Sequence, residues 1–490
     1  MFAKINSAAL NGLKAISVTL EVNAFLTKGG DGTESTFFMV GLPDNAVRES
    51  KQRVLSALAN SAFRLPRMNV TVNLAPADIR KEGSGFDLPL AVGLLKTTDI
   101  VKADRLDEVA FVGELGLDGT IRSVRGALPI AIEARKQGFK ALFVPKANER
   151  EAGVVNHLKV YGVKTLKEVV DALNGNLSLT PVAVNTRADF YAAQTTYPLD
   201  FADVKGQTAA KRAFEVAAAG GHNLMIVGSP GCGKSMMAKR LPSILPQLTL
   251  AESLETTQIY SIAGELPAET SLIARRPFRS PHHTISDVAL IGGGMTLRPG
   301  EISLAHNGVL FLDELPEFSR SALETLRQPL EDREITIRRT RYAATLPCSF
   351  MLVAAMNPCP CGYYNHPTRS CECTPQQVQR YLGKVSGPLL DRIDLQVEIA
   401  PVNFEKLADA RPAESSASIR ERVLRAREIQ IRRFADYPEV HCNAQMTPKM
   451  MQLFAHPDSA GLEKLRLAME RLDLSARAYD RILKVARTIA

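Results

Sequence analysis

The sequence lacks any long apolar run. Its 490 residues contain no stretch approaching the ~20 apolar residues that a membrane-spanning helix needs. The N-terminal segment MFAKINSAALNGLKAISVTL has no apolar centre of the kind found in secretory signals, and repeats and low-complexity tracts are also absent. These absences argue against a membrane or secreted protein and against a repeat array. We expect a cytoplasmic protein with no membrane partner.

The composition is that of an ordinary globular protein. Hydrophobic residues make up 45% and charged residues 23%, which allows well-filled cores, and a length of 490 residues predicts two or three domains. The net charge is +8 and the sequence pI is about 9.1. This charge is compatible with a polyanionic partner such as nucleic acid, although net charge bears on association rather than on fold.

The first part of the chain mixes strand and helix patterns. Residues 1–175 contain strand-like runs such as NVTVNLAP, ALFVP and LKVYGV together with helix-like runs, which predicts an α/β or α+β domain. Asp44 is expected to cap the helix that begins after Pro43. Residues 176–200 lack periodicity and are rich in small polar residues, so we interpret them as a linker.

The remainder divides into an α/β core and a helical end. Residues 201–402 alternate helical runs with the apolar runs NLMIVG, GVLFLDE and FMLVAAMN, as expected for a parallel sheet covered on both faces. Residues 403–490 are helical, and Ser418 with Glu421 fits a capping box at a helix start. Because the chain stops within an apparent helix, we expect a further stretch to follow Ala490.

A phosphate-binding loop lies at the start of the core. The segment GSPGCGKS fits the pattern G-x-x-x-x-G-K-[ST], and it follows a predicted strand and precedes a helical stretch. Its glycines let backbone N–H groups surround phosphates, while a helix N-terminus adds positive potential. Lys234 is expected to reach the β- and γ-phosphates of ATP, and the Ser235 hydroxyl to ligate Mg²⁺. The alternative is a glycine-rich turn without a ligand. The predicted nucleotide-binding residues are Gly228, Ser229, Pro230, Gly231, Cys232, Gly233, Lys234 and Ser235.

Two later apolar runs end in polar residues that suit the same site. Asp313 ends the run GVLFL at the strand edge where phosphates bind, and we expect it to hold the Mg²⁺ hydration shell. Glu314 is expected to orient and deprotonate the attacking water. Asn357 ends the run FMLVAAM and could hold that water or sense the γ-phosphate, although an Asn before Pro is also a common turn.

Four of the seven cysteines lie close together within residues 358–375. They form C-x-C, nine residues, then C-x-C, and four thiolates satisfy tetrahedral Zn²⁺. His366 is a possible substitute ligand, and a redox switch or four uninvolved thiols are the alternatives. Cys348 and Cys442 fit isolated packing residues. The predicted zinc ligands are Cys359, Cys361, Cys371 and Cys373.

Three longer segments carry a family resemblance. They are RPFRSPHHTISDVALIGGG at 276–294, GEISLAHNGVLFLDELPEF at 300–318 and MNPCPCGYY at 356–364. With the phosphate-binding loop, they resemble the bacterial ComM/YifB family of magnesium-chelatase-like AAA+ ATPases, and the resemblance covers essentially the whole chain. It implies an AAA+ core with a helical C-terminal lid, assembled as a homo-hexamer with ATP between subunits.

The resemblance also implies roles for single residues. Asn357 would be the sensor-1 residue, and Arg392 the arginine finger that reaches a neighbour's ATP and neutralises charge on the transferring phosphoryl group. Arg477 matches the sensor-2 position, with Arg481 as a second claimant. From the residues alone, the alternative for Arg392 is an ion pair with the adjacent Asp391 or with Asp394.

Residues 1–175 resemble the Lon-protease-like fold of the ribosomal S5 domain 2-like superfamily. The matching segments are IRKEGSGFDLPLAVGLL and FVGELGLDGTIRSVRGALPIA. A Lon protease needs a Ser nucleophile beside a Lys base. Gly85 lies where the Ser would be and Leu128 where the Lys would be, while Ser84 is one place off. We therefore expect a non-catalytic binding or assembly module.

Two segments are candidates for elements that line a central pore. The first, residues 275–300, is glycine-rich and includes Arg279, His282 and His283, and we expect the histidines to be hydrogen-bonded structural residues. The second, residues 334–349, resembles a hairpin with a basic tip. Basic tips can follow a phosphate backbone in a salt-sensitive way, although ordinary surface loops are the alternative. The predicted nucleic-acid contacts are Arg298, Arg338, Arg339 and Arg341.

The ComM resemblance implies an ATP-dependent helicase acting on single-stranded and branched DNA. Such a motor would drive branch migration during homologous recombination of incoming DNA in natural transformation. A magnesium-chelatase motor subunit and another protein-remodelling AAA+ ATPase or Lon-like protease are the alternatives. The Lon-like domain and the four-cysteine insertion argue against the first, and the missing Ser–Lys pair against the second. The expected cofactors are ATP, Mg²⁺ and structural Zn²⁺.

Overall fold

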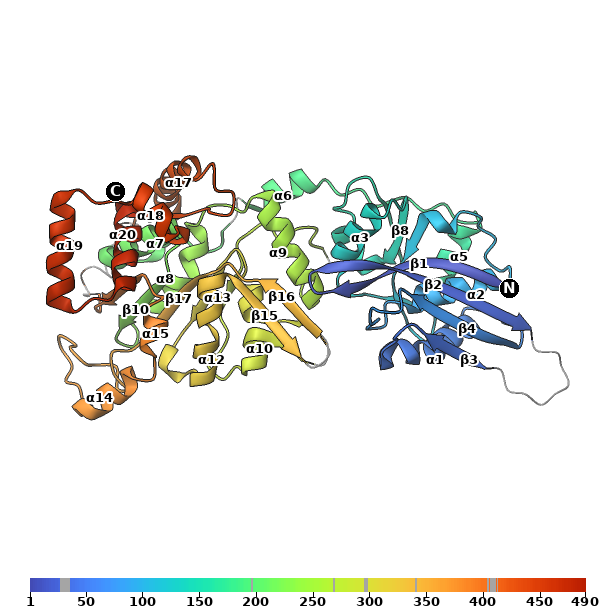
Figure 1. The fold of residues 1–490 in the computed structure, drawn as a ribbon, viewed down its shortest axis with the longest axis horizontal. Helices are drawn as coiled ribbons and strands as arrows, with labels where there is room; N and C mark the ends of the chain where they lie inside the picture. Colours follow the sequence, from blue (N-terminus) through green and yellow to red (C-terminus); the bar gives the residue numbers. More distant parts are fainter. Residues whose placement is uncertain are drawn as a thin grey trace. The chain divides into compact units, whose positions relative to one another are not determined.

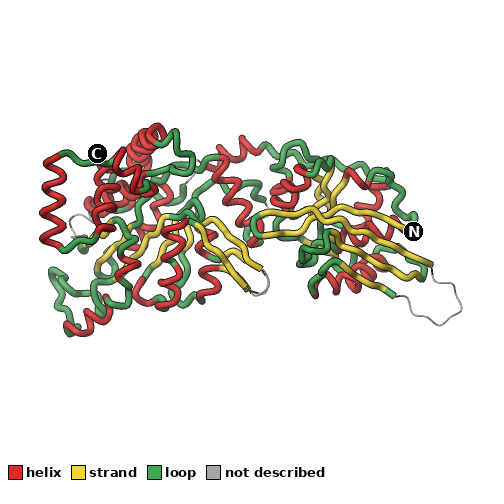
Figure 2. The backbone as a smooth tube through the Cα atoms, viewed as in Figure 1, coloured by secondary structure: helices red, strands yellow, loops and turns green. Residues whose placement is uncertain are grey.

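The chain folds into two compact units in the computed structural model. The structure describes residues 1–490 except 27–35, 195–196, 268, 295–297, 340–341, 403–404, 406–410 and 412, and for residues 339 and 342 it describes the backbone alone. The first unit comprises Met1–Ala193, Leu250–Ala274 and Met295–Arg298, and the second comprises Gln194–Thr249, Arg275–Gly294 and Pro299–Ala490. The structure is a mixed α/β fold (Figures 1 and 2).

The first unit is built on a seven-stranded mixed sheet with the order β3-β4-β2-β1-β5-β8-β9. Its longest strands, β1 and β2, form an antiparallel hairpin in which Asn11 pairs with Lys14, and Gly12 adopts a left-handed φ of 62° in the turn. The strands are β1 (Phe2–Asn11), β2 (Lys14–Leu26), β3 (Phe37–Val40), β4 (Met68–Ala75), β5 (Val109–Phe111), β6 (Glu114–Leu115), β7 (Ile121–Arg122), β8 (Ala141–Pro145) and β9 (Lys159–Val163). The three predicted strand runs are confirmed as β4, β8 and β9.

Helices cover this sheet, and the most buried is α2, which packs on β1 and β2. Gly93 permits this close approach, because a methyl group added there would lie 2.7 Å from Val22 Cγ2. Asp44 caps α1 as predicted by accepting a hydrogen bond from the Val47 N–H. The helices are α1 (Asn45–Asn60), α2 (Asp87–Thr97), α3 (Ala127–Lys136), α4 (Glu149–Ala152), α5 (Leu166–Leu173), α6 (Thr186–Gln194) and α9 (Leu250–Ala263).

The second unit contains the predicted parallel sheet, with the order β11-β14-β17-β10-β18. The apolar runs named above form β10, β14 and β17, and β17 is buried along its whole length. A separate antiparallel hairpin, β15–β16, confirms the hairpin predicted at 334–349. The strands are β10 (Leu224–Gly228), β11 (Phe278–Arg279), β12 (Gly292–Gly293), β13 (Arg298–Pro299), β14 (Val309–Leu312), β15 (Glu334–Arg339), β16 (Tyr342–Pro347), β17 (Met351–Met356) and β18 (Leu395–Ile399).

The C-terminal part is helical, as predicted (Figure 2). The capping prediction there is wrong by three residues, because Ser415 caps α17 by accepting from the Ser418 N–H. No helix among the described residues combines the length and apolar character needed to cross a bilayer. The second unit's helices are α7 (Thr208–Gly220), α8 (Lys234–Arg240), α10 (Asp287–Ile291), α11 (Glu301–Leu304), α12 (Arg320–Thr325), α13 (Arg327–Asp332), α14 (Pro375–Leu382), α15 (Gly387–Leu390), α17 (Ser416–Arg433), α18 (Pro448–Phe454), α19 (Ser459–Leu472) and α20 (Ala476–Ile489).

The domain ranges inferred from sequence stay predictions. Two observations bear on them. The expected linker 176–200 contains α6, whose Phe190 is buried. The segment Leu250–Ala274 belongs to the first compact unit, although it lies within the predicted range 201–402.

A buried ion pair joins α1 to α2 in the first unit. Arg53 donates to both carboxylate oxygens of Asp87, at 2.7 and 2.9 Å, and the Asp87 side chain is fully buried. Burial raises the pKa of Asp87, and the hydrogen bond from Arg53 opposes that rise. The guanidinium therefore offsets part of the cost of burying this carboxylate inside the unit.

Arg53→Ala is expected to destabilise the first unit by about 3–5 kcal/mol, because it leaves a buried carboxylate without its partner. Hydrogen exchange of the α2 amides measures this local free energy of opening. Arg48→Ala is the matched control, since Arg48 is exposed on the same helix. Equal protection of α2 in the two variants would contradict the role assigned to the ion pair.

Candidate functional site

The predicted phosphate-handling residues meet at one edge of the parallel sheet. β10 pairs in parallel with β17, with Val227 opposite Met356, and β17 pairs with β14. The carboxyl ends of these strands therefore lie side by side. The loop after β10 turns sharply into α8, and Gly231 and Gly233 adopt left-handed φ values of 78° and 95° that favour glycine.

Lys234 lies at the N-terminus of α8 and points back into this edge. Its Nζ donates to Asn357 Oδ1 at 2.9 Å and to the carbonyl oxygens of Gly228 and Ser229. Burial lowers the pKa of Lys234, and the nearby Asp313 is among the charges that oppose this change. A buried ammonium held by neutral oxygens in this way is well placed to accept a phosphate.

Ser235 and Asp313 form the second half of the constellation. The Ser235 hydroxyl donates to the Asp313 carboxylate, so two oxygens from α8 and from the end of β14 lie together. Hydroxyl and carboxylate oxygens are the donors that Mg²⁺ prefers, so these residues fit that ion. The structure thus brings together Lys234, Ser235, Asp313 and Asn357, as the sequence suggested.

Glu314 follows Asp313 directly after the end of β14. It has a left-handed φ of 54°, and its side chain is 58% exposed. His283 Nδ1 lies 3.3 Å from Glu314 Oε2. The first candidate pore segment therefore contributes a histidine beside the predicted catalytic carboxylate, a contact that no local sequence pattern indicates.

The predicted arginines lie at the opposite edge of the sheet. Asn223 directly precedes β10, and its side chain donates to the Arg392 carbonyl oxygen. β10 has five residues, so about 17 Å of strand separates Asn223 from Gly228, where the phosphate-binding loop begins. Arg481 donates to the Leu390 and Ile393 carbonyl oxygens at the same end. These arginines are thus remote from the phosphate loop of their own chain.

Arg392 is held by an acidic residue of α13. Its guanidinium pairs with Glu331, and its side chain is only 9% exposed. The sequence alternative, an ion pair of Arg392 with Asp391 or Asp394, is therefore wrong about the partner. Asp391 contacts Arg481 instead. Arg477 lies 3.8 Å from the same Glu331 oxygen and is 60% exposed.

A cavity of about 560 Å³ adjoins the phosphate-binding loop. Residues of that loop and of α8 form one wall, the segment that contains Asp203 and Gln207 forms a second, and residues after β18 complete the base. Part of the four-cysteine loop, including Tyr363 and Arg369, also lines the cavity. These contributors were missed in the sequence, because only the fold brings them together.

The four cysteines of the insertion converge as predicted. Their Sγ atoms all lie within 4.8 Å of one another, with the nearest pairs 3.3 to 3.7 Å apart. Zn–S bonds of about 2.3 Å in a tetrahedron place sulfurs about 3.8 Å apart, so the cluster fits zinc. Backbone N–H groups of Gly362 and Tyr364 donate to Cys359 Sγ, and the Tyr363 N–H lowers the pKa of Cys361 to about 6. Both features favour thiolates at Cys359 and Cys361, the form that binds metal, whereas the neighbouring Cys361 and Cys359 raise the pKa of Cys371 to about 12.

The other residues near or outside this cluster have separate roles. His366 Nδ1 accepts from the Thr368 and Arg369 N–H groups, which orients the ring within the loop rather than toward the sulfurs. Cys348 and Cys442 are buried away from the cluster, in agreement with packing roles.

The candidate DNA contacts are only partly described. Arg338 is exposed on β15, whereas Arg341 and the side chain of Arg339 lie outside the described residues. Arg298, the first residue of β13, is exposed and is grouped with the first unit, whereas Pro299 belongs to the second. Burial and the Arg298 charge lower the pKa of Arg125. Arg279 instead forms a bidentate pair with Glu301, at 2.6 Å for each contact. His282 bonds Thr284, in line with a structural role.

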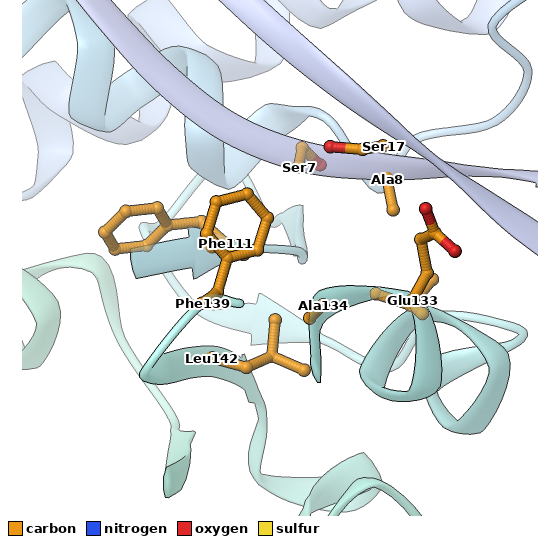
Figure 3. A pocket seen from close by; sticks show the side chains of 10 residues that line it. Ser7, Ala8, Ser17, Phe111, Glu133, Ala134, Phe139 and Leu142 are labelled. Carbon is orange, nitrogen blue, oxygen red and sulfur yellow. The ribbon is translucent and has the colours of Figure 1, made fainter. Parts of the chain in front are cut away.

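The first unit holds no Ser–Lys pair at the positions of a Lon-type site. Gly85 and Leu128 occupy these positions, Leu128 is fully buried, and the Ser84 hydroxyl bonds the Glu114 carboxylate. A hollow elsewhere in this unit lies between β1, β2 and α3 (Figure 3), and it has no space for a water molecule. It is a packing gap rather than a ligand site.

Comparison with known proteins identifies the family. Residues 27–148, 200–407 and 413–490 match three models described as magnesium chelatase subunit ChlI, the last as its C-terminal part. The chain is 44% identical over 492 aligned residues to competence protein ComM of Haemophilus influenzae, covering 100% of this chain and 93% of the relative. It is 43% identical to YifB of Escherichia coli, covering 99% and 92%.

A more distant similarity covers a smaller part of the chain. Lon protease 2 of Bacillus subtilis is 24% identical over 125 residues, which are 25% of this chain and 22% of that protein. The full-length matches and the strand-end constellation agree with each other. The chain belongs to the ComM/YifB family of magnesium-chelatase-like AAA+ ATPases.

Proposed function

We propose that this protein is a cytoplasmic, hexameric ATP-driven DNA motor that promotes branch migration of incoming DNA during natural transformation. The observation that carries the ATPase part is the meeting of Lys234 with Asn357, and of Ser235 with Asp313, at one strand edge. The competence name of the full-length relative supports the DNA part.

The residues at this strand edge have different proposed roles in ATP hydrolysis, according to their positions. Lys234 binds the β- and γ-phosphates, while Ser235 and Asp313 hold Mg²⁺, which neutralises charge on the phosphates when bound. Glu314 accepts the proton of the attacking water, and Asn357 positions that water. His283 orients Glu314 through the contact between Nδ1 and Oε2. These assignments rest on strand-end placement and on the family pattern.

The arginines act on a neighbouring subunit's ATP. Arg392 and Arg477 lie at the sheet edge opposite the phosphate loop, so they serve a site formed with the next subunit of the ring. Glu331, which contacts both, holds them before engagement. The geometry therefore favours an assembly in which every site is shared by two chains.

DNA binding is assigned to the basic hairpin. β15 and β16 form a ribbon whose exposed Arg338 stands near the turn, and Arg339 and Arg341 continue the basic run in sequence. Arginines on such a tip can follow a phosphate backbone without reading sequence. Arg298 is a further candidate contact.

The first unit is proposed as a non-catalytic Lon-like module. The partial similarity to Lon protease 2 supports the scaffold, while Gly85 and Leu128 replace the pair that peptide hydrolysis needs. Binding or assembly is its proposed role. A magnesium-chelatase-like partner remodeller remains the second candidate, favoured by the ChlI family models.

A subunit-mixing experiment tests the shared site. Lys234→Ala and Arg392→Ala proteins are each expected to lack ATPase activity, and Arg392→Ala is expected to retain nucleotide binding. Mixing them should restore partial activity, because an intact Lys234 in one chain then faces an intact Arg392 in its neighbour. A mixture as inactive as its components, with subunit exchange shown by mass spectrometry, would refute the trans role.

A salt series tests the DNA motor. Single-stranded and branched DNA should bind in a salt-dependent way and stimulate ATP hydrolysis. Arg338→Ala should reduce the slope of log affinity against log salt by about 1, since one phosphate contact is lost. Fluorescence anisotropy measures the affinity, and Arg466→Ala, which removes an exposed arginine of α19, is the control. ATP hydrolysis that DNA leaves unchanged, with no salt-sensitive binding, would exclude the helicase.

Metal analysis tests the zinc site. The purified protein is expected to carry about one Zn²⁺ per chain, because four thiolates complete a tetrahedral shell. The Cys359→Ser/Cys371→Ser double variant should lose the metal, whereas Cys348→Ala should keep it, since Cys348 lies outside the cluster. Equal metal content in the wild type and the double variant would disprove zinc binding at these cysteines.

A further inference from the structure

The four-cysteine loop, which leads from β17 to α14, packs directly on the phosphate-binding loop. Gly362 has a left-handed φ of 85°, and a methyl group added there would lie 2.5 Å from Pro230 Cδ. The loop is also tied to the site at its start. Asn357, which bonds the Lys234 ammonium, precedes the first cysteine by two residues. Two separate contacts thus join the cysteine loop to the nucleotide-binding residues.

The part of the loop between the two C-x-C pairs presents a preassembled surface to the 560 Å³ cavity. Arg369 donates to the Tyr363 hydroxyl at 2.7 Å, and its guanidinium lies 5.1 Å from the Tyr363 ring centre. His366 packs edge-on against the same ring and accepts from the Arg369 N–H. An aromatic ring beside a guanidinium suits the flat, electron-rich base and the anionic phosphates of a nucleotide.

The sulfur cluster holds this surface in place. The Tyr363 backbone lies between Gly362 and Tyr364, whose N–H groups both donate to Cys359 Sγ. Cys361 and Cys371 bracket the segment that contains His366 and Arg369. A metal bound by the four thiolates closes this segment into one rigid loop, and without that closure the loop loses most of its local restraint.

We infer that the four-cysteine loop is the outer wall of the nucleotide pocket. Tyr363 and Arg369 contact bound ATP, and the metal on the cysteines sets the affinity for nucleotide. This inference rests on the proposed ATPase function and adds to it a metal-dependent control of ATP binding. The cysteine cluster then affects nucleotide binding directly, in addition to stabilising the loop.

Titration with a fluorescent ATP analogue tests the inference on the assembled protein. Tyr363→Ala should weaken binding about tenfold, through loss of the stacking surface, while its zinc content stays unchanged. Tyr364→Ala is the matched control, because Tyr364 is 45% exposed and does not line the cavity. Its affinity should equal that of the wild type.

A second experiment measures nucleotide affinity after removal of the metal from the four cysteines. Protein stripped by a chelator, with the chelator then removed, should bind the analogue at least about tenfold more weakly, and added Zn²⁺ should restore the affinity. If Tyr363→Ala and stripped protein both bind like the wild type, the inference is overturned and the ATPase proposal stands. If the loaded wild type binds no nucleotide, the ATPase proposal itself falls, and this inference with it.

Discussion

Parallel strands that end at one edge of a sheet impose the arrangement of the second unit. Because β10, β14 and β17 run in the same direction, the residues that follow them share one edge, and Lys234, Asp313 and Asn357 come together there. For the same reason, the segments that lead into the strands of this parallel sheet lie at its other edge. The segment that carries Arg392 is one of them. One chain therefore cannot place both sets around the same phosphate, which is why the proposed motor requires a neighbour.

The features predicted correctly from sequence are those with local causes. A buried parallel strand is a short continuous apolar run, so β10, β14 and β17 were visible without any tertiary information. The phosphate-binding loop is one contiguous segment of sequence. Asp44 caps α1 through a hydrogen bond from Val47, only three residues further along the chain. The hairpin β1–β2 was missed although Asn11–Gly12 at its turn is a strong hairpin signal. At α17, three nearby serines offered competing caps, and local pattern could not choose Ser415.

The features that sequence did not reveal depend on contacts between distant segments. Glu331 holds Arg392 because α13 and the segment after α15 return to the same sheet edge, whereas the sequence alternative named the nearby Asp391 or Asp394 as partner. His283 reaches Glu314 because β11 and β14 pair in parallel, so the residues that follow the two strands lie at one edge of the sheet. The cavity wall is another case, since Gln207 and Tyr363 are far apart in sequence and line one cavity only through the tertiary fold. Such contacts are set by packing, which local propensity does not encode.

The two ends of the proposed nucleotide site are built by different physical means. At the phosphate end, Asp313 and Asn357 directly follow buried strands, so the packed sheet core fixes their positions. At the other end, the wall is a loop whose shape depends on four sulfurs and on the contact of Gly362 with Pro230. In the proposed site, a change in the cysteine loop therefore alters how nucleotide is held, and it reaches Lys234 through Asn357 and through the contact of Gly362 with Pro230. Asn357, two residues from Cys359, is the point where the two ends meet.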